Sequence, residues 1–264
     1  MTITPLAPVI GRASTASLAV TKVLWPKGLN TSIYLDLNNF SRHTAWAHGF
    51  MHAYALWLGL VVLAVLFVIG YGAIWWRRAL RPAVVMALSG AGTVAALGIN
   101  QVVGHAAAEL RPYDTYTHAL VLVAKAHDYA FPSDHAVVAG GLITSVFLAA
   151  RAAQVYRNRA WARTDRQRAV PFLVGVGICS IVFGLFLCFA RIYVGAHYPG
   201  DVVAGLLLGA ATVLAFSVLR PLVYWLADLV TTTPLRVVLS RPEPRAVPPT
   251  VPPAPISVQD VLPK

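Results

Sequence analysis

The chain has 264 residues, of which 58% are hydrophobic and 12% are charged, and its mean hydropathy is positive. This composition lies well outside the average of soluble globular domains and excludes an ordinary soluble protein. The net charge of +11 would suit a nucleic-acid partner, but its arginines concentrate in two short loops. Such clustering indicates membrane topology, so we expect no nucleic acid as a partner.

Residues 1–52 precede the first long apolar stretch and form an N-terminal segment, with an interfacial or re-entrant helix expected around residues 33–52. Further along, stretches of about 18 or more residues carry few or no charges, roughly the length with which a helix crosses ~30 Å of hydrocarbon. They cover residues 53–76, 82–104, 133–150, 169–190 and 202–219. A buried helix of a soluble protein explains one such stretch but not all of them. We predict an all-α fold, a polytopic membrane helix bundle with about five transmembrane helices.

The loops between these stretches set the expected orientation. Arg77, Arg78 and Arg81 lie in one loop. A second loop contains Arg151, Arg157, Arg159, Arg163, Arg166 and Arg168. Because cytoplasmic loops carry an excess of Lys and Arg, both are expected in the cytoplasm. The connections 105–132 and 191–201 then face the outside, together with the N-terminal segment.

The transmembrane domain is expected to cover residues 53–226. Residues 227–264 contain many prolines and few large apolar residues. This composition is typical of a polyproline-like chain without a packed core. We predict a disordered cytoplasmic tail, whose contacts the sequence leaves open.

The first polar clusters with chemical interest lie in the connection 105–132 and directly after it. Arg111 is followed by a proline, and the run FPSDH at 131–135 places Ser133 and His135 at the start of the third apolar stretch. We expect Pro132 at the first helical position, which proline favours. The unpaired N–H groups of a helix start bind phosphate readily, and Ser133 adds a hydroxyl donor. Alone, His135 would be an interfacial side chain that caps a helix.

A second histidine changes this interpretation. The run HYPGD at 197–201 again places a proline at a helix entrance, and the i, i+4 spacing brings Asp201 within reach of the His197 ring. A carboxylate that holds one ring nitrogen leaves the other free as a base or nucleophile. Arg191 lies shortly before His197, and guanidinium groups match phosphate oxygens. Each arginine alone could be a snorkelling anchor. Two arginines, two histidines and a carboxylate on one side of a membrane together indicate a phosphate site.

These clusters resemble the three-part signature of the type 2 phosphatidic acid phosphatase superfamily, which reads Lys-x6-Arg-Pro, Pro-Ser-Gly-His and Ser-Arg-x5-His-x3-Asp. The likeness covers about residues 100–205 and includes the order of the motifs and their placement at helix starts. Asp134 within the middle motif, the run RIYVGAHYPGD at 191–201 and the asparagines at 38–39 make the chain similar to the bacitracin-resistance branch. Members of that branch hydrolyse undecaprenyl diphosphate.

The resemblance implies a mechanism and a location. His197 would attack phosphorus to form a phosphohistidine, Asp201 would orient it, and His135 would protonate the departing oxygen. Arg111, Arg191 and Ser133 would bind the phosphate. The enzyme would lie in a bacterial plasma membrane with its site on the extracytoplasmic face, and would regenerate the undecaprenyl phosphate carrier of cell-wall synthesis, which confers resistance to bacitracin.

The chain departs from the family pattern at two positions. The family lysine falls at Gly104, so that one phosphate-binding cation is missing or is supplied by Lys125 or His105. Ala190 replaces a serine that would donate a hydroxyl. No metal or cofactor is expected: His135, His197 and Asp201 could bind zinc in principle, but the nearby arginines oppose a divalent ion.

Other functions stay open at this point. The lipid substrate could be phosphatidylglycerol phosphate, phosphatidate or another polyprenyl phosphate, since the motifs recognise phosphate and not the lipid tail. A transporter or permease subunit is an alternative of another class. Transport sites usually show polar groups at the membrane midplane, and the spans offer only Asn100 and Gln101, near the end of the second. The sequence does not decide the oligomeric state.

Overall fold

The computed structural model describes residues 27–77, 79–126, 128–155 and 163–232, and these residues form helices and loops without strands. The predicted all-α fold is therefore confirmed. The long helices are α2 (Lys27–Arg42), α4 (Gly59–Trp76), α5 (Leu80–Ala107), α7 (Asp134–Val155), α8 (Arg163–Tyr193), α9 (Pro199–Phe216) and α10 (Arg220–Thr232). Shorter helical segments are η1 (Ala45–Ala47), α3 (His48–Ala53), η2 (Tyr54–Leu58), α6 (Pro112–Thr115) and η3 (Ser217–Leu219).

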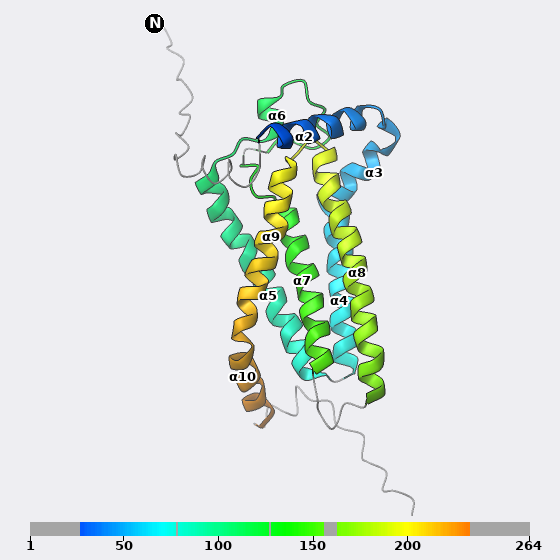
Figure 1. Ribbon diagram of the computed structural model, residues 1–264, viewed down its shortest axis with the longest axis vertical. Coiled ribbons are helices and arrows are strands. Elements are labelled where there is room, and N and C mark those ends of the chain that lie inside the picture. The colour runs from blue at the N-terminus through cyan, green and yellow to red at the C-terminus, as the bar shows by residue number, and fades with distance from the viewer. Residues whose placement is uncertain (1–26, 78, 127, 156–162, 233–264) are drawn as a thin grey trace, which may run out of the picture. The chain divides into compact units, whose positions relative to one another are not determined.

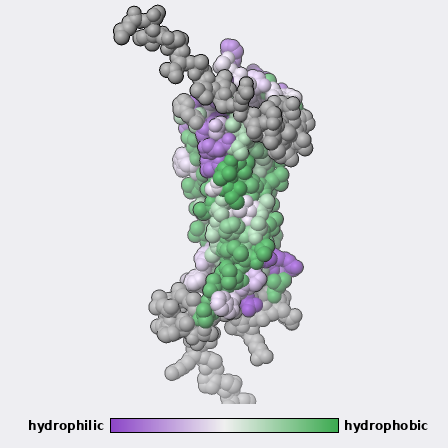
Figure 2. All heavy atoms as spheres, turned by 90° about the vertical axis from the view of Figure 1, so that its left-hand side faces the viewer, coloured by the Kyte–Doolittle hydropathy of each residue, from purple (hydrophilic) through white to green (hydrophobic). Residues whose placement is uncertain are grey.

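Five helical segments are long and apolar enough to cross a membrane, as the sequence predicts. They are Ala45–Trp76, Leu80–Thr115, Asp134–Val155, Arg168–Tyr193 and Pro199–Leu226. The chain is therefore a multi-pass helical membrane protein. Figure 2 shows hydrophobic residues over the middle of the face that it presents, with hydrophilic residues gathered toward both ends. The proline-rich tail from residue 233 onward lies outside the described residues.

Helix α7 is the centre of the bundle, since it packs against α4, α5, α8 and α9. Glycines make its contact with α9 close. A Cβ at Gly205 would lie 2.6 Å from the carbonyl oxygen of Ser133, and one at Gly209 would collide with the carbonyl oxygen of Val137. Small residues at such positions let membrane helices approach closely. The Gly205 and Gly209 pair therefore serves packing within this chain, and it aligns the start of α7 with the start of α9.

Helix α2 lies across the ends of the long helices and contacts α8 and α9 (Figure 1). We call this side the α2 end of the bundle. The interfacial helix expected around residues 33–52 takes a different form: α2 covers Lys27–Arg42, and the residues from Ala45 onward continue into the first span. A turn at His43 and Thr44 separates the two, with the Thr44 hydroxyl donating to the carbonyl of Phe40 at 3.0 Å.

The opposite end of the bundle carries Arg77, Arg81 and Arg151 and an apolar core, while Arg78, Arg157 and Arg159 lie outside the described residues. Arg77 and Arg81 flank the turn between α4 and α5, and Arg151 lies in the last turns of α7. The buried core there is built from aliphatic side chains of α4, α5, α7 and α8. Its members are Ile74, Ala79, Ala83, Met86, Val146, Ala149, Ala150, Ala153, Ala169, Leu173 and Val176.

Candidate active site

His197 lies at the α2 end, in the short loop between α8 and α9, and is only 2% exposed. The loop reaches this position through Gly195, whose φ of +81° favours glycine. The Nδ1 atom of His197 is 2.8 Å from the carbonyl oxygen of Ala130. Because a carbonyl only accepts, Nδ1 carries the proton and Nε2 presents its lone pair. The ring is thus held as the tautomer that a nucleophilic Nε2 requires.

Two arginines face that Nε2 atom. Arg111 Nη1 lies 3.2 Å from it and Arg191 Nη2 lies 3.1 Å from it, and each arginine is 6% exposed. Arg111 is fixed by Asp128, whose carboxylate is 2.7 Å from Nε, and by the carbonyl of Ala196 at 3.0 Å. A buried nitrogen between two guanidinium groups defines a position for an anion that carries several oxygens.

Asp201 is buried close to the His197 ring, as the spacing predicts. Its Oδ2 atom is 3.5 Å from Nδ1 of His197, but it accepts a shorter hydrogen bond, 2.8 Å, from the backbone N–H of Tyr198. An acidic residue in the first turn of a helix reaches back to the N-cap N–H in this way. The carboxylate therefore acts on the imidazole at a distance, while the carbonyl of Ala130 makes the direct contact.

Ser133 joins the two helix starts. Its backbone N–H donates to the carbonyl of Asp201 at 3.0 Å, while its buried Oγ has no hydrogen-bond partner among the described residues. The expectation for Pro132 is wrong: α7 begins at Asp134, two residues later, and Ser133 directly precedes the helix. Ser133 opens the helix through its backbone, because its carbonyl accepts from the N–H of Val137 at 3.0 Å, and its hydroxyl makes no capping bond within the described residues.

His135 points toward a π-helical turn in the first span. Its Nε2 atom is 3.2 Å from the carbonyl oxygen of Leu56, and Arg191 Nη1 donates to the neighbouring carbonyl of Ala55 at 3.3 Å. Both carbonyls belong to η2, which is a π-helix. Single π-helical turns within α-helices are frequent at functional sites. The first span therefore holds two of the site residues through its backbone, a contribution that sequence reasoning missed because it uses no side chain.

A groove of about 430 Å³ opens beside His135. Its walls are apolar residues of α4, α5 and α7, and its polar residues come from the start of α7 and from α5. The lining consists of Leu60, Leu97, Gly98, Gln101, Asp134, His135 and Val138. A mainly apolar groove with a few convergent polar groups is the usual form of a site for an amphipathic ligand.

Asp134 is engaged by the two amides of α5. Its Oδ1 accepts from Asn100 Nδ2 at 2.6 Å and from Gln101 Nε2 at 3.0 Å. The polar residues noted in the second span therefore anchor the FPSDH segment, and Asn100 also donates to the carbonyl of Pro132 at 3.1 Å. These contacts link α5 to the start of α7.

The position of the missing lysine lies near the site. A Cβ at Gly104 would be 3.2 Å from the carbonyl oxygen of Phe131. Of the two suggested replacements, Lys125 has its Nζ 5.7 Å from the centroid of the Tyr113 ring. His105 bonds through Nδ1 to the carbonyl of Gln101 at 2.7 Å. Lys125 and His105 thus contact Tyr113 and Gln101, and neither of these contacts is with Arg111, Arg191 or His197.

The surroundings of His197 keep its imidazole neutral. Burial lowers its pKa well below the ordinary value of 6.5, and the charges of Arg191 and then Arg111 lower it further. The bond to Ala130 opposes this shift. A neutral imidazole is the form that attacks an electrophile. Within the described residues, no group of three or more His, Cys, Asp or Glu side chains is placed to hold a metal ion.

The fold and the site define a class: a multi-pass helical membrane protein with a histidine set between two arginines at one end of its bundle. Comparison with known families makes this specific. The model described as the PAP2 superfamily matches residues 78–225, which is more than half of the chain and includes the site histidines His135 and His197. The chain belongs to this superfamily.

Individual relatives resemble part of the chain. An undecaprenyl-diphosphatase of Sulfolobus acidocaldarius is 29% identical over 118 residues, which are 44% of this chain and 46% of the relative. The undecaprenyl-diphosphatase BcrC of Bacillus subtilis is 32% identical over 127 residues, 48% of this chain and 52% of BcrC. The chain thus spans about half the length of the curated relatives it matches.

A solved structure also resembles this chain. It is the crystal structure of a transmembrane PAP2 type phosphatidylglycerolphosphate phosphatase from Bacillus subtilis, with a TM-score of 0.49 and 16% identity. The match covers 81% of this chain and 94% of that protein.

Proposed function

We propose that this protein is a membrane lipid-phosphate phosphatase that forms a phosphohistidine on Nε2 of His197. The observation that carries the proposal is the position of this atom, 3.2 Å from Arg111 Nη1 and 3.1 Å from Arg191 Nη2. The two guanidinium groups would bind the phosphoryl oxygens that flank the attacking nitrogen. Ser133 Oγ and Arg191 Nε, which have no hydrogen-bond partner within the described part of the chain, are further donors for the same group.

In the first step the lone pair of His197 Nε2 forms a bond to phosphorus, and the bond from phosphorus to the leaving oxygen breaks. Nδ1 keeps its proton, which is donated in a hydrogen bond to the carbonyl of Ala130. Once Nε2 carries the phosphoryl group, the ring is therefore cationic, and Asp201, 3.5 Å away, compensates this charge. His135 donates a proton to the leaving oxygen. The carbonyl of Leu56 accepts from its Nε2, so Nδ1 is the nitrogen that exchanges the proton.

In the second step water attacks phosphorus and His135 takes a proton from that water. The bond between Nε2 and phosphorus breaks, which returns the electron pair to His197 and releases inorganic phosphate. Catalysis of phosphoryl transfer depends mainly on positioning and on a preorganised set of cations. The buried pair Arg111 and Arg191 provides such a set of cations beside the attacking nitrogen.

The substrate we propose is undecaprenyl diphosphate, which would be converted to undecaprenyl phosphate. Two matched relatives carry the name undecaprenyl-diphosphatase, and this supports the choice. The groove beside His135 offers apolar walls to a lipid chain and a polar end to its head group. The activity would recycle the lipid carrier of cell-wall synthesis and would confer resistance to bacitracin.

We propose a bacterial plasma membrane as the location, with the α2 end on the extracytoplasmic face. Arg77, Arg81 and Arg151 support this orientation, because they lie at the opposite end of the bundle and such loops stay in the cytoplasm. A single cysteine at exposed His43, introduced in a variant without Cys179 and Cys188, should react with an impermeant thiol reagent in intact cells. Reaction only after permeabilisation would reverse the orientation.

Phosphate release by the detergent-purified protein tests the reaction. Undecaprenyl diphosphate, phosphatidylglycerol phosphate and phosphatidate should be offered side by side, with His197→Ala as the control. We expect preferential release from the polyprenyl diphosphate, and acid-labile phosphate on the wild-type protein after rapid quenching. Preferential release from another lipid would correct the substrate, and wild-type turnover by His197→Ala would refute the mechanism.

The variant His135→Ala distinguishes a diphosphate from a monoester substrate. General acid catalysis contributes about 10² to 10⁴ in rate. The acid matters most when the leaving group is an alkoxide, as in phosphatidate, and less when it is a phosphate, which departs easily without a proton. Single-turnover rates should therefore fall more for phosphatidate than for undecaprenyl diphosphate. Equal losses on both substrates would contradict the role of His135 as the acid.

A further inference from the structure

Helix α2 presents a row of side chains to the loops around the nucleophile. Asn30, Tyr34, Asn38 and Arg42 follow one another at intervals of four residues, which places them on one face of the helix. We call them the α2 row. The motifs that carry the chemistry do not include them, and each makes a contact far away along the sequence.

The first two members of the α2 row meet the segment that carries His197. Asn30 Oδ1 accepts a hydrogen bond of 2.8 Å from the backbone N–H of Gly200, in the first turn of α9. Tyr34 is 0% exposed, and its ring centroid lies 5.3 Å from that of Tyr198. The two contacts fall on either side of Pro199, directly after the nucleophile. Helix α2 therefore fixes the path by which the chain leaves His197.

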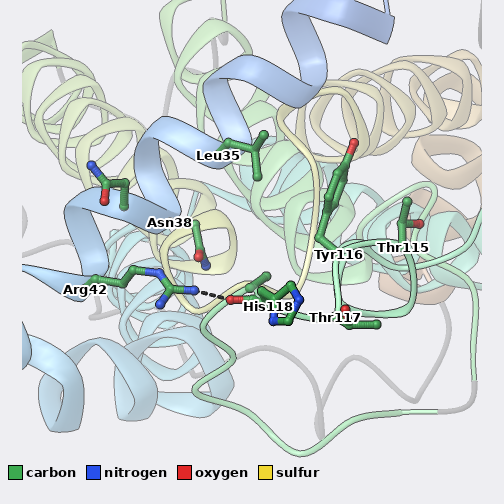
Figure 3. Close-up of a pocket in the computed structure, with 9 residues that line it drawn as sticks. Leu35, Asn38, Arg42, Thr115, Tyr116, Thr117 and His118 are labelled. Carbon is green, nitrogen blue, oxygen red and sulfur yellow. Dashed lines mark hydrogen bonds between the residues drawn. The ribbon is translucent and has the colours of Figure 1, made fainter.

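The other members hold the neighbouring loop. Asn38 Nδ2 donates to the carbonyl of Leu120 at 2.7 Å and its Oδ1 accepts from the N–H of the same residue at 3.0 Å. Arg42 donates to the carbonyl of His118, as Figure 3 shows. This loop in turn supports the nucleophile segment, since the N–H of Leu122 donates to the carbonyl of Val194 at 3.0 Å.

We propose that Asn30 is a positioning residue for the nucleophile, which acts through the N–H of Gly200, and that the α2 row as a whole clamps the His197 segment in its reactive position. The proposal rests on the proposed function, in which His197 Nε2 attacks phosphorus. The bond to Ala130 sets the tautomer and direction of the ring, but the backbone of residues 197–200 sets its place between Arg111 and Arg191. A displacement of about 1 Å is enough to cost roughly 10²-fold in rate.

Two substitutions at Asn30 separate positioning from general stability. Asn30→Leu keeps the branching at Cγ and the number of side-chain heavy atoms but removes the acceptor, whereas Asn30→Asp keeps an oxygen at the same place. Asn39→Leu is the matched control, because Asn39 lies on the same helix with an exposed side chain outside the α2 row. For Asn30→Leu we expect kcat per folded molecule to fall about 10-fold or more with a KM within about threefold of wild type. Asn30→Asp and Asn39→Leu should stay close to wild type.

A transition-state analogue gives a readout that a merely structural role would not change. Orthovanadate adopts the five-coordinate geometry of the transferring phosphoryl group, and its inhibition constant should rise for Asn30→Leu in proportion to the loss of kcat/KM. Inorganic phosphate, which does not need the attacking nitrogen in line, should inhibit both proteins similarly. Equal weakening of vanadate and phosphate, a loss of folded protein at unchanged kcat, or equal losses for Asn30→Leu and Asn30→Asp would overturn the proposal.

Hydrogen exchange keeps the inference separate from the proposed function. Peptides that cover residues 194–201 should exchange faster in Asn30→Leu than in wild type or Asn39→Leu, whatever the substrate is. If the wild-type protein releases no phosphate from any lipid, the proposed function fails and this measurement alone decides about the clamp. Unchanged exchange in this segment would then overturn it.

Discussion

The two ends of the helix bundle are built from the same helices in opposite ways. At the α2 end, Arg111, Arg191, His197 and Asp201 are all buried, and Ser133 Oγ, Arg191 Nε and Asp201 Oδ1 have no hydrogen-bond partner among the described residues. At the opposite end, α4, α5, α7 and α8 share a buried hydrophobic cluster of aliphatic side chains and Met86. Because buried polar groups without partners cost free energy, the α2 end is held in place by the rest of the bundle. The chemical groups are therefore concentrated at the α2 end, where hydrophobic clusters around Tyr193 and Tyr34 pack beside them, whereas the buried cluster at the opposite end carries no such groups.

Substitution of one buried residue at each end should separate activity from stability, and we expect the largest effects here. His197→Ala should lower phosphate release by about 10³-fold or more, since the attacking atom is lost. Its unfolding temperature should stay near that of wild type. Leu173→Ala, in the aliphatic core, should lower the free energy of unfolding by about 2 kcal/mol or more and leave kcat per folded molecule unchanged.

Activity and thermal unfolding of the same detergent-purified samples measure both properties. A strongly destabilised His197→Ala protein, or a Leu173→Ala protein that is fully folded but inactive, would remove the contrast between the ends.

The glycines between α7 and α9 let the first turns of α7 pack closely against α9 next to the site, so a substitution there should affect both stability and activity. A Cβ at Gly209 would collide with the carbonyl oxygen of Val137, whereas one at Gly175 would meet no atom of another helix within 4 Å in the part of the chain that the structure describes. We expect Gly209→Ala to destabilise the protein by about 1 to 3 kcal/mol through overpacking. Activity should fall as well, because α9 can no longer keep Asp201 next to Ser133.

Gly175→Ala is the matched control for this change. Alanine favours a helix over glycine by up to about 1 kcal/mol, so this variant should be as stable as wild type or slightly more stable. Equal unfolding temperatures for the two alanine variants would show that the close approach of α7 and α9 is unimportant.

The charges at the α2 end predict a specific dependence on pH. Burial, Arg191 and Arg111 all lower the pKa of His197, so the wild-type protein should keep a neutral nucleophile at pH values below 6.5. Arg111→Gln removes one of the cations, which raises this pKa and moves the acid limb of kcat/KM toward higher pH. Arg111→Lys keeps the charge and should keep the limb in place. Profiles of residual kcat/KM over the acid range would contradict this electrostatic picture if both variants moved alike.

The same shift affects stability with a defined sign. His197 stays neutral in the folded protein while the unfolded chain takes up a proton at about its ordinary pKa of 6.5. Below pH 6.5 the unfolded chain therefore binds a proton that the folded protein does not. The free energy of unfolding is highest with respect to this group above pH 6.5, and it decreases as the pH falls toward the lowered pKa of His197 in the folded protein. Among the described residues, the buried acidic and basic side chains are Arg111, Arg191, His197 and Asp201, all at the α2 end.

The sequence predicts what side chains encode locally. The apolar stretches give the five spans, and the i, i+4 spacing at a helix start places His197 and Asp201 together. Arg191 lies six residues before His197 near the end of α8, and the fold of the intervening loop brings its Nη2 to 3.1 Å from His197 Nε2. It does not predict that Ala130 rather than Asp201 bonds to the imidazole, since a carbonyl oxygen carries no residue-specific signal and the carboxylate is taken by the N–H of Tyr198.

The contacts of α2 with distant parts of the chain could not be predicted from the sequence for a related reason. The interval of four residues between Asn30, Tyr34 and Asn38 places them on one face of α2. The helix expected from the sequence begins only around residue 33, so the sequence does not predict this row. Their targets lie in loops 82 or more residues away, and only tertiary packing brings them together. The π-helical turn that supports His135 is likewise a backbone feature, and no residue type in the run YALWL predicts it.

The smallest effect concerns the one aromatic residue that belongs to both the clamp and the buried polar groups of the α2 end. Tyr34 packs between Tyr116, with ring centroids 6.1 Å apart, and Tyr198, yet its buried hydroxyl has no partner among the described residues. Tyr34→Phe keeps the ring contacts and removes a hydroxyl whose burial is uncompensated, so the protein should be unchanged or up to about 1 kcal/mol more stable, with wild-type kcat. Tyr34→Ala, which removes the ring as well, should lower both. A loss of activity in Tyr34→Phe at unchanged stability would mean that the hydroxyl itself takes part in the reaction, and that the α2 row contributes chemistry as well as position.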